Sequence, residues 1–467
     1  MLRFGPRSPN IQRHTSLGPA SFWVLILGMA TKSSAVPLQA ERFPPVDRAG
    51  LGGLAKLFED LLEKAREAAL EPAKVKKLRT WNTTEVAALL EMTDDALRRR
   101  LKRDLAEQET AKDAAPGNTP LPQGTAKNGR RYFTLEEIHA LQKALWPQPK
   151  RDPTRDAPLV LSIANFKGGV SKSTTALHLA QYLVLHGYKV LLIDLDAQAT
   201  LTQQFGILPH IDVPETETPL PLFESAAGAQ SLRNAIRKTY WHNLDLVCSN
   251  LAFYGAEFSL ASRLTRALES GEAFRFYRVL AEGLETVKQD YDVVVLDTAP
   301  SLSFVNSNAI FAIDAFVVAM PPAMLELQSG GLFFRWLEEL LRLFEQAEIE
   351  DKVYDFVALL ITRMKTAPHD GQPQRTRAAH EEIRDWLRTY FPNHIVTTPM
   401  LESDALRKAS QELLSLYEVQ TRETDRRTFG RALNAMNAVN AEIESAIQAA
   451  WQRRRERNKT EASAPSS

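Results

Sequence analysis

The sequence predicts an α/β fold: a mostly parallel sheet covered by helices on both faces, preceded by a mainly α-helical winged helix-turn-helix domain. Short apolar runs alternate with helical segments from residue 159 onward, as in buried parallel sheets. A glycine-rich loop follows the first of these runs, at the strand end where such sheets bind ligands. Farther upstream, a tight link joins two short helical segments, the second of them basic, which is the helix-turn-helix pattern.

Composition limits the classes of protein that remain. The 467 residues are enough for two or three folded units with a large core. With 57 basic and 57 acidic residues the formal net charge is zero, so any nucleic-acid surface must be local. The single cysteine, Cys248, excludes a disulfide framework and a CxxC metal site. It ends an apolar run, so we expect a buried structural thiol and a cytoplasmic protein.

Five segments are expected along the chain. They are a disordered leader or mis-set start (1–48), an N-terminal helix with a winged DNA-binding domain (49–145), a linker (146–158), an α/β domain (159–450) and a disordered tail (451–467). The apolar run Phe22–Met29 resembles a secretory signal, but it is too short to span a bilayer. Met29 and the residues after it resemble the ordinary beginning of a protein. We therefore interpret the preceding residues as the product of a mis-set start or as a disordered leader.

The DNA-binding domain begins with an amphipathic helix over Leu51–Leu70. Its apolar stripe fits an intramolecular core and a dimer contact equally well. Asn82 or Thr83 is then expected to cap a helix running to about Leu90.

A second helix is predicted from Asp94 to about Arg103, with a basic outer face. Gly129–Ile138 is similar to the wing and following helix of MerR-like winged modules, and a mobile loop is expected over Thr110–Lys127. A basic helix face is usually only a solvated surface, but the wing-like segment favours DNA binding. Base edges would be read from the helix and phosphates met by the wing. The candidate residues are Arg98, Arg99, Arg100, Lys102, Arg130 and Arg131.

The strands of the α/β domain are predicted from apolar runs of four to six residues. They are Leu159–Ala164, Val190–Ile193, Leu244–Val247, Val293–Leu296, Ala315–Ala319 and Phe356–Ile361. Helices are predicted over Thr175–Leu185, Leu332–Phe344 and Arg377–Leu387, whereas Gly206–Asn243 is less regular.

Residues 165–175 read Asn-Phe-Lys-Gly-Gly-Val-Ser-Lys-Ser-Thr-Thr, a loop that cradles nucleotide phosphates. Lys172 can reach the β- and γ-phosphates, and the Ser173 hydroxyl can ligate Mg²⁺. The strict pattern has glycine where Phe166 and Ser171 stand, and the deviation adds Lys167. The expected ATP-binding residues are Gly168, Gly169, Val170, Ser171, Lys172, Ser173 and Thr174.

This loop resembles the deviant Walker-A ATPases of the ParA/MinD superfamily. Leu191–Gln198 is similar to their second motif, Val293–Ser301 to their Walker-B strand, and Met400–Val419 to the C-terminal part of ParA-type partition proteins. The resemblance covers roughly residues 156–450, and the long N-terminal extension is similar to larger plasmid partition ATPases of the RepA type. Two positions depart from the family pattern: Ser171 stands where the family usually has Gly, and Ala197 where it often has Pro.

Chemistry and resemblance together assign roles. Lys172 is expected to neutralise phosphate charge, and Ser173 and Asp297 to hold Mg²⁺. The alternative for Asp297 is that an aspartate at the end of a buried strand is a simple cap. The resemblance implies that Asp196 positions the attacking water and that Asp194 belongs to the metal surroundings or a switch. It also implies that Lys167 crosses a dimer interface to the partner's phosphates, although a loop lysine is usually solvated.

The resemblance implies an ATP-dependent plasmid partition protein that uses ATP and Mg²⁺ and is associated with the nucleoid. Its ATP-bound homodimer would bind DNA non-specifically, with Arg407 and Lys408 as candidates, although a basic helix face can also be merely solvated. A ParB-like centromere-binding partner would stimulate weak ATP hydrolysis, and the winged domain would bind an operator and repress its own operon. The alternative is a nucleotide-responsive repressor without transport. A membrane-bound regulator would need an amphipathic membrane helix at its end, and the sequence there lacks the repeated apolar face. An iron–sulfur reductase would need cluster cysteines, which a single cysteine cannot supply.

Overall fold

The computed structural model describes residues 47–69, 76–110, 120–146, 149–225, 231–347, 352–365, 374–420 and 426–463. The chain divides into two units, residues 1–77 and 78–467. In the first unit, α2 (Arg48–Ala69) corresponds to the helix expected over Leu51–Leu70. Within its described side chains, the stripe Leu51, Leu54, Leu57, Phe58 and Leu61 is exposed. All but the last two residues of the expected leader lie outside the described residues.

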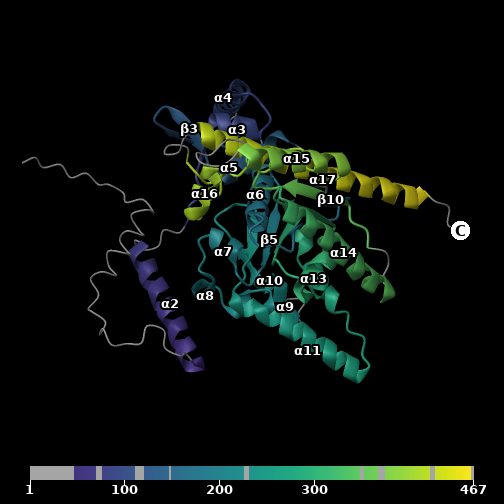
Figure 1. Cartoon of the computed structure of the whole chain (residues 1–467). Coiled ribbons are helices and arrows are strands. Elements are labelled where there is room, and N and C mark those ends of the chain that lie inside the picture. The colour runs from purple at the N-terminus through teal and green to yellow at the C-terminus, as the bar shows by residue number, and fades with distance from the viewer. Residues whose placement is uncertain are drawn as a thin grey trace, which may run out of the picture. The chain divides into compact units, whose positions relative to one another are not determined.

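A mostly parallel sheet organises the second unit (Figure 1). Among the described residues it has seven strands in the order β10-β9-β4-β8-β5-β7-β6, and β6 pairs antiparallel with β7 at the edge. The strands are β4 (Leu159–Ala164), β5 (Val190–Leu195), β6 (Ile236–Lys238), β7 (Leu244–Val247), β8 (Val293–Thr298), β9 (Ala315–Met320) and β10 (Phe356–Ile361). The fold class and the six predicted strands are confirmed; the short β6 lies in the stretch whose pattern was irregular.

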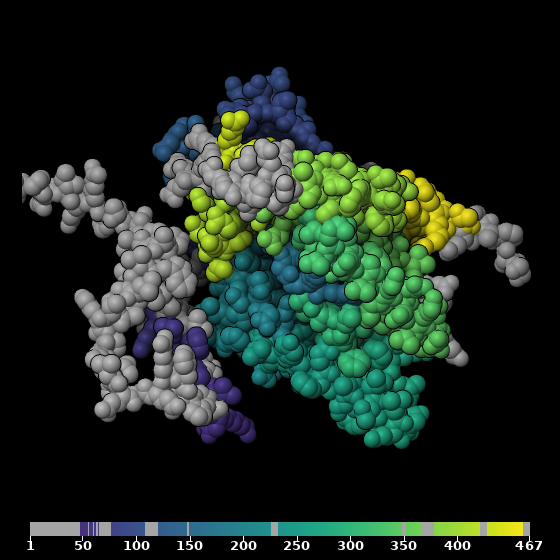
Figure 2. Space-filling model, in the orientation of Figure 1, coloured from purple at the N-terminus to yellow at the C-terminus, as the bar shows by residue number. Residues whose placement is uncertain are grey.

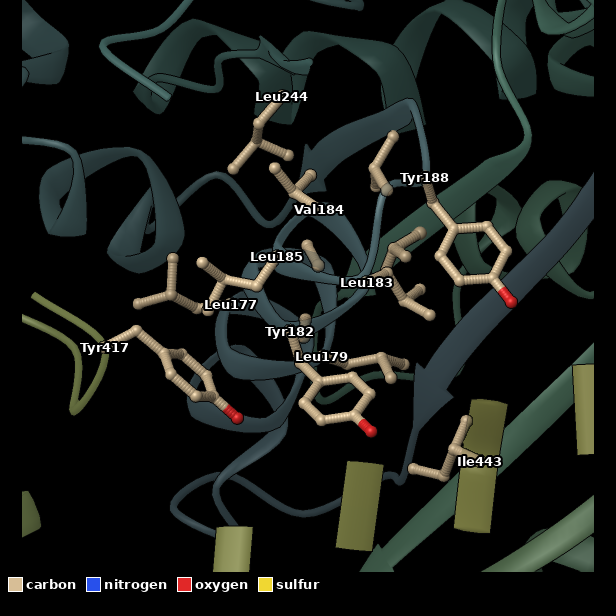
Figure 3. Packing of buried hydrophobic residues seen from close by; sticks show 14 of the residues in the cluster. Leu177, Leu179, Tyr182, Leu183, Val184, Leu185, Tyr188, Leu244, Tyr417 and Ile443 are labelled. Atoms are coloured by element: carbon tan, nitrogen blue, oxygen red, sulfur yellow. The ribbon is translucent and has the colours of Figure 1, made fainter. Parts of the chain in front are cut away.

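Alternate residues of each strand enter two separate cores because side chains alternate across a sheet. Leu159, Leu161 and Ile163 face α6 (Lys172–Leu185) and α17 (Arg426–Ser463). Figure 3 shows this packing, with Leu177 and Leu183 among the side chains that fill it. The other face packs against α9 (Leu220–Glu224), α11 (Gly255–Ser270), α12 (Val279–Glu285), α13 (Phe304–Ala312) and α14 (Met324–Gln346).

The remaining helices of the α/β domain are short or lie at its margins. They are α7 (Thr200–Gln204), α8 (Pro209–Asp212), α10 (Ser231–Ala235), α15 (Gln374–Tyr390) and α16 (Asp404–Gln411). Figure 2 shows α11, teal-green, projecting at the lower margin of the unit. Cys248 is buried, as predicted. None of the described helices is both long and apolar enough to cross a bilayer.

The winged module contains the helices expected from sequence. Its elements are β1 (Trp81–Asn82), α3 (Thr83–Leu89), α4 (Asp94–Thr110), β2 (Thr125–Lys127), β3 (Arg130–Phe133) and α5 (Leu135–Leu145). Asn82 caps α3, since its Oδ1 accepts from the Glu85 N–H at 3.1 Å while Glu85 Oε2 accepts from the Asn82 N–H at 2.9 Å. The second helix continues to Thr110, past its predicted end near Arg103. Half of the predicted mobile loop, residues 111–119, lies outside the described residues, and its last three residues form β2.

The expected linker is a packed part of the second unit, which corrects the prediction of a spacer. Arg151 is buried and donates to Asp292 Oδ1 and to the Asp156 carbonyl, both at 2.9 Å. The winged module also shares the core of the α/β domain, where the Trp81 and Trp241 rings lie 6.3 Å apart in an edge contact. Proline content indicated a connector but did not reveal the burial of its arginine.

The prediction of a disordered tail from residue 451 is wrong for the part that the structure describes, because α17 continues to Ser463. Trp451 is buried, and its Nε1 donates to the Ala157 carbonyl at 3.0 Å. Arg454 pairs with Asp314 at 3.1 Å and also with Asp355. Arg455 pairs with Asp156. The basic run binds carboxylates that precede strands, which composition alone does not reveal.

Candidate nucleotide site and DNA-binding surfaces

The glycine-rich loop between β4 and α6 is tightly curled. Gly169 has φ +74° and Ser171 has φ +71°, both in the left-handed region. Ser171 therefore adopts the backbone conformation that glycine would allow, although this conformation is uncommon for residues other than glycine. Its carbonyl accepts from the Thr175 N–H at 2.9 Å and so starts α6. Val170 is buried, and its carbonyl accepts from the Thr362 hydroxyl at 3.0 Å.

Lys172 is a buried ammonium group inside this loop, with 7% of the residue exposed. Its Nζ donates to the Lys167 carbonyl at 2.9 Å. Burial lowers the pKa of Lys172, and the charges of Asp297 and Asp196 partly oppose that shift. A lysine ammonium has three donors. The group is therefore placed to donate to a phosphate bound in the loop.

Two carboxylates lie side by side at the ends of neighbouring strands, since Asp194 on β5 is in register with Asp297 on β8. Burial raises the pKa of both. Asp194 is held by Thr202, whose N–H and hydroxyl donate to it at 2.9 and 2.7 Å. Within the described residues, neither oxygen of Asp297 has a regular hydrogen bond, although the Ser173 hydroxyl is near enough to lower its pKa.

These residues fit a magnesium ion. A buried carboxylate without a partner is rare unless something else satisfies it, and Mg²⁺ prefers oxygen ligands combined with phosphate. Asp297 with Ser173 supplies that donor set. Asp196 follows the strand, half-buried, and its Oδ1 accepts from the Gln198 N–H at 2.9 Å.

Lys167 points to its own chain. Its Nζ donates to the Leu325 carbonyl at 3.0 Å and pairs with Glu326 Oε1 at 3.2 Å, both at the start of α14. A reach across a dimer interface therefore requires Lys167 to leave Glu326. Glu326 was not predicted from the sequence, because it lies 159 residues from Lys167 along the chain and no local pattern marks it.

Comparison with known proteins agrees with this geometry. Residues 159–347 match a family model described as an AAA domain. A protein described as replication protein A from Rhizobium rhizogenes is 33% identical over 416 residues, covering 86% of this chain and 96% of that protein. The chain belongs to the ParA family of ATPases.

Other relatives extend across most of this ParA-family chain. Protein SopA of Escherichia coli strain K12 is 27% identical over 352 residues, which are 74% of this chain and 82% of SopA. A solved structure named Partition Protein covers 84% of this chain and 99% of its own, with a TM-score of 0.53 and 20% identity. The latter likeness concerns the fold. The family predicted from the sequence is thus confirmed.

A cavity of about 660 Å³ opens beside the loop of the ParA-family chain. Ser171, Thr174, Arg363, Met400 and Arg407 are among its lining residues. The Arg363 guanidinium donates to the Gly169 carbonyl at 3.2 Å, and its backbone has φ +53°. Arg363 was not predicted from the sequence, although it follows β10 at the edge of the sheet where such folds bind ligands.

The winged module brings four of its six predicted DNA-binding residues to one groove. A hollow of about 650 Å³ between α4 and the wing is lined by Arg98, Lys102, Arg130 and Arg131. Arg98 pairs with Asp94 at 3.1 Å, but 63% of its side chain is exposed.

The other predicted DNA-binding residues lie elsewhere. Arg99 and Arg100 are exposed on α4 but do not line the groove. Arg407 and Lys408 are exposed on α16, and Arg407 pairs with Asp404 at 2.7 Å. Arg407, predicted to meet DNA, thus also lies at the cavity beside the phosphate loop.

Proposed function

We propose that this chain is an ATP-dependent plasmid partition protein. ATP and Mg²⁺ would bind at the curled loop, with the nucleoside in the neighbouring cavity. The observation that carries this proposal is a buried Lys172 ammonium group in the curled loop, within electrostatic range of a buried Asp297 carboxylate that has no regular hydrogen bond among the described residues. The sequence relatives that span most of the chain put it in the ParA family, and a solved structure with the same fold is named Partition Protein.

Each residue has a task in hydrolysis. Lys172 donates to the phosphate oxygens, while Ser173 and Asp297 hold the metal surroundings, with Asp194 as a neighbouring switch. Mg²⁺, when bound, neutralises charge on the phosphates. Asp196 orients the attacking water from the strand end. Lys167 leaves Glu326 and reaches the phosphates of a second copy, so that ATP favours a homodimer.

Two DNA surfaces serve partition and regulation. The groove of the winged module would bind an operator and repress the operon, whereas Arg407 and Lys408 would contact any duplex and keep the dimer on the nucleoid. A ParB-like partner bound to the plasmid would stimulate hydrolysis and release the dimer. The close packing of the winged module on α6 also favours the second candidate, a nucleotide-responsive repressor without transport.

Inheritance of an unselected plasmid separates these two functions. Cells would carry the wild-type gene or Lys172→Gln, and a reporter would measure repression in the same cells. Plasmid loss in Lys172→Gln cells is the expected result, whether or not the reporter shows altered repression. Normal inheritance in these cells would refute partition and leave the repressor.

A further inference from the structure

A buried turn, Ser415–Glu418, lies between the candidate nucleotide site and the winged module. It is called the 415–418 turn below. Ser415 and Glu418 close it, since the Ser415 N–H donates to Glu418 Oε2 at 2.8 Å. The Tyr417 hydroxyl donates to Asn437 Oδ1 on α17 at 3.0 Å. Figure 3 shows the Tyr417 ring beside the apolar residues of α6. The turn is therefore held by side chains from distant parts of the chain.

One imidazole ring joins this turn to the phosphate loop. The Leu416 N–H donates to His178 Nε2 at 3.1 Å, so the ring proton must be on Nδ1. His178 Nδ1 then donates to the Thr174 carbonyl at 2.7 Å. Thr174 lines the nucleotide cavity and follows Ser173, the candidate magnesium ligand. A shift in the first turn of α6 thus acts directly on the Leu416 backbone.

One arginine joins the other side of the turn to the winged module. Arg79 Nε donates to the Tyr417 carbonyl at 2.7 Å, and its second nitrogen pairs with Glu85 Oε1 at 2.8 Å. The guanidinium carbon lies 4.9 Å from the centre of the Trp81 ring. Only 13% of the Arg79 side chain is exposed. Glu85 is the residue that completes the cap of α3, and it lines the basic groove.

We propose that Arg79 and the 415–418 turn couple nucleotide binding at the phosphate loop to operator binding in the basic groove. The inference rests on the proposed function, which supplies both ligands. Coupling between sites is a free energy carried by packed groups with two arrangements, and it acts equally in both directions. Arg79 is a positioning residue here: it sets α3 through Glu85 and touches neither ligand.

Two elements that line the nucleotide cavity are connected to the 415–418 turn: α6 through His178, and α16 because it precedes the turn in the sequence. Thr174 lines the cavity from α6, and Leu406 lines it from α16, which ends at Gln411, four residues before Ser415. A ligand that draws these two walls together changes the position of the Tyr417 carbonyl. Because Arg79 bonds both this carbonyl and Glu85, the cap of α3 follows.

The test compares Arg79→Met with a matched control. Methionine keeps an apolar stem against Trp81 and removes both polar contacts. The control is Arg263→Met, because Arg263 also donates to a backbone carbonyl, that of Phe223, at 2.8 Å and lies 4.4 Å from the Phe274 ring. The probe is a duplex that the wild-type protein selects from a random-sequence pool. Its dissociation constant is measured with and without a non-hydrolysable ATP analogue.

We expect the analogue to change wild-type affinity for this duplex by about tenfold, within the usual range of coupling. The ratio should fall toward one in Arg79→Met and stay at the wild-type value in Arg263→Met. Affinity for the analogue without DNA should be unchanged in Arg79→Met, which shows that the variant is folded. His178→Gln cuts the path at its other end, so the double variant should lose no more coupling than either single variant.

The outcomes separate the inference from the proposed function. A wild-type protein that binds neither the analogue nor any selected duplex would refute the function and the coupling together. A wild-type protein that binds both without mutual influence would overturn only the coupling. Retention of the full ratio in Arg79→Met would mean that dimer formation alone links the sites, and the inference would be wrong.

Discussion

His178 makes the stability of the second unit depend on pH. Burial lowers the pKa of His178 from 6.5 to about 4, while the Thr174 carbonyl and Glu418 partly oppose the shift. Since the folded-state pKa is below the unfolded one, the unfolded chain binds more protons in acid. The stabilisation is present above pH 6.5 and is lost as the pH falls toward 4.

These two values give a magnitude for the His178 contribution. Moving from pH 7 to pH 5 should cost about 2 kcal/mol of unfolding free energy through this residue alone. Protonation at Nε2 would also remove the acceptor of the Leu416 N–H. His139 is similarly buried with a pKa near 4, so it adds a separate contribution in the wild type.

Urea unfolding at the two pH values, followed by fluorescence, measures this term. His178→Gln should be less stable than wild type at neutral pH but lose about 2 kcal/mol less on acidification. His210→Gln, which changes an exposed histidine on α8, is the control and should behave as wild type. Equal acid sensitivity in wild type and His178→Gln would refute the reasoning.

Three further predictions concern other parts of the molecule. Trp451→Ala should lower the unfolding free energy by about 3–5 kcal/mol in urea titration, because a buried indole and its hydrogen bond are lost; a change typical of an exposed residue would restore the tail interpretation. Glu326→Gln should release Lys167 and increase the dimer fraction with a non-hydrolysable ATP analogue in sedimentation, with Glu338→Gln on the same helix as control; an unchanged fraction would speak against a role of Lys167 in dimerisation. Arg407→Gln with Lys408→Gln should flatten the salt dependence of binding to random duplex by about 0.9 per lost phosphate contact, whereas Arg342→Gln should leave the slope as it is.

Six strands were predictable because each is a mostly apolar run, and parallel strands buried on both faces produce that pattern. The helix caps at Asn82 and Ser403 also follow local rules, since their side chains bond to backbone three residues ahead. The phosphate loop carries its own signature in eleven consecutive residues. Local chemistry of this kind can be predicted from a single sequence.

The contacts that could not be predicted join residues far apart in the chain. Lys167 finds Glu326, and Arg79 finds the Tyr417 carbonyl, across 159 and 338 positions. The basic run after Trp451 has the composition of a solvated tail, yet its arginines meet aspartates that only the folded sheet brings together. Periodicity reports which face of an element is buried, but not which partner covers it.

Arginines of the linker and of α17 cluster where β4, β8, β9 and β10 begin. Asp156, Asp292, Asp314 and Asp355 lie just before β4, β8, β9 and β10, and Arg151, Arg454 and Arg455 neutralise them. In a parallel sheet this rim is opposite the edge that faces nucleotide. A variant ending at Ala450 would therefore be a poor tool for mapping DNA contacts. It would leave three of these acids unpaired, and the lost binding would report a loosened sheet rather than missing phosphate contacts.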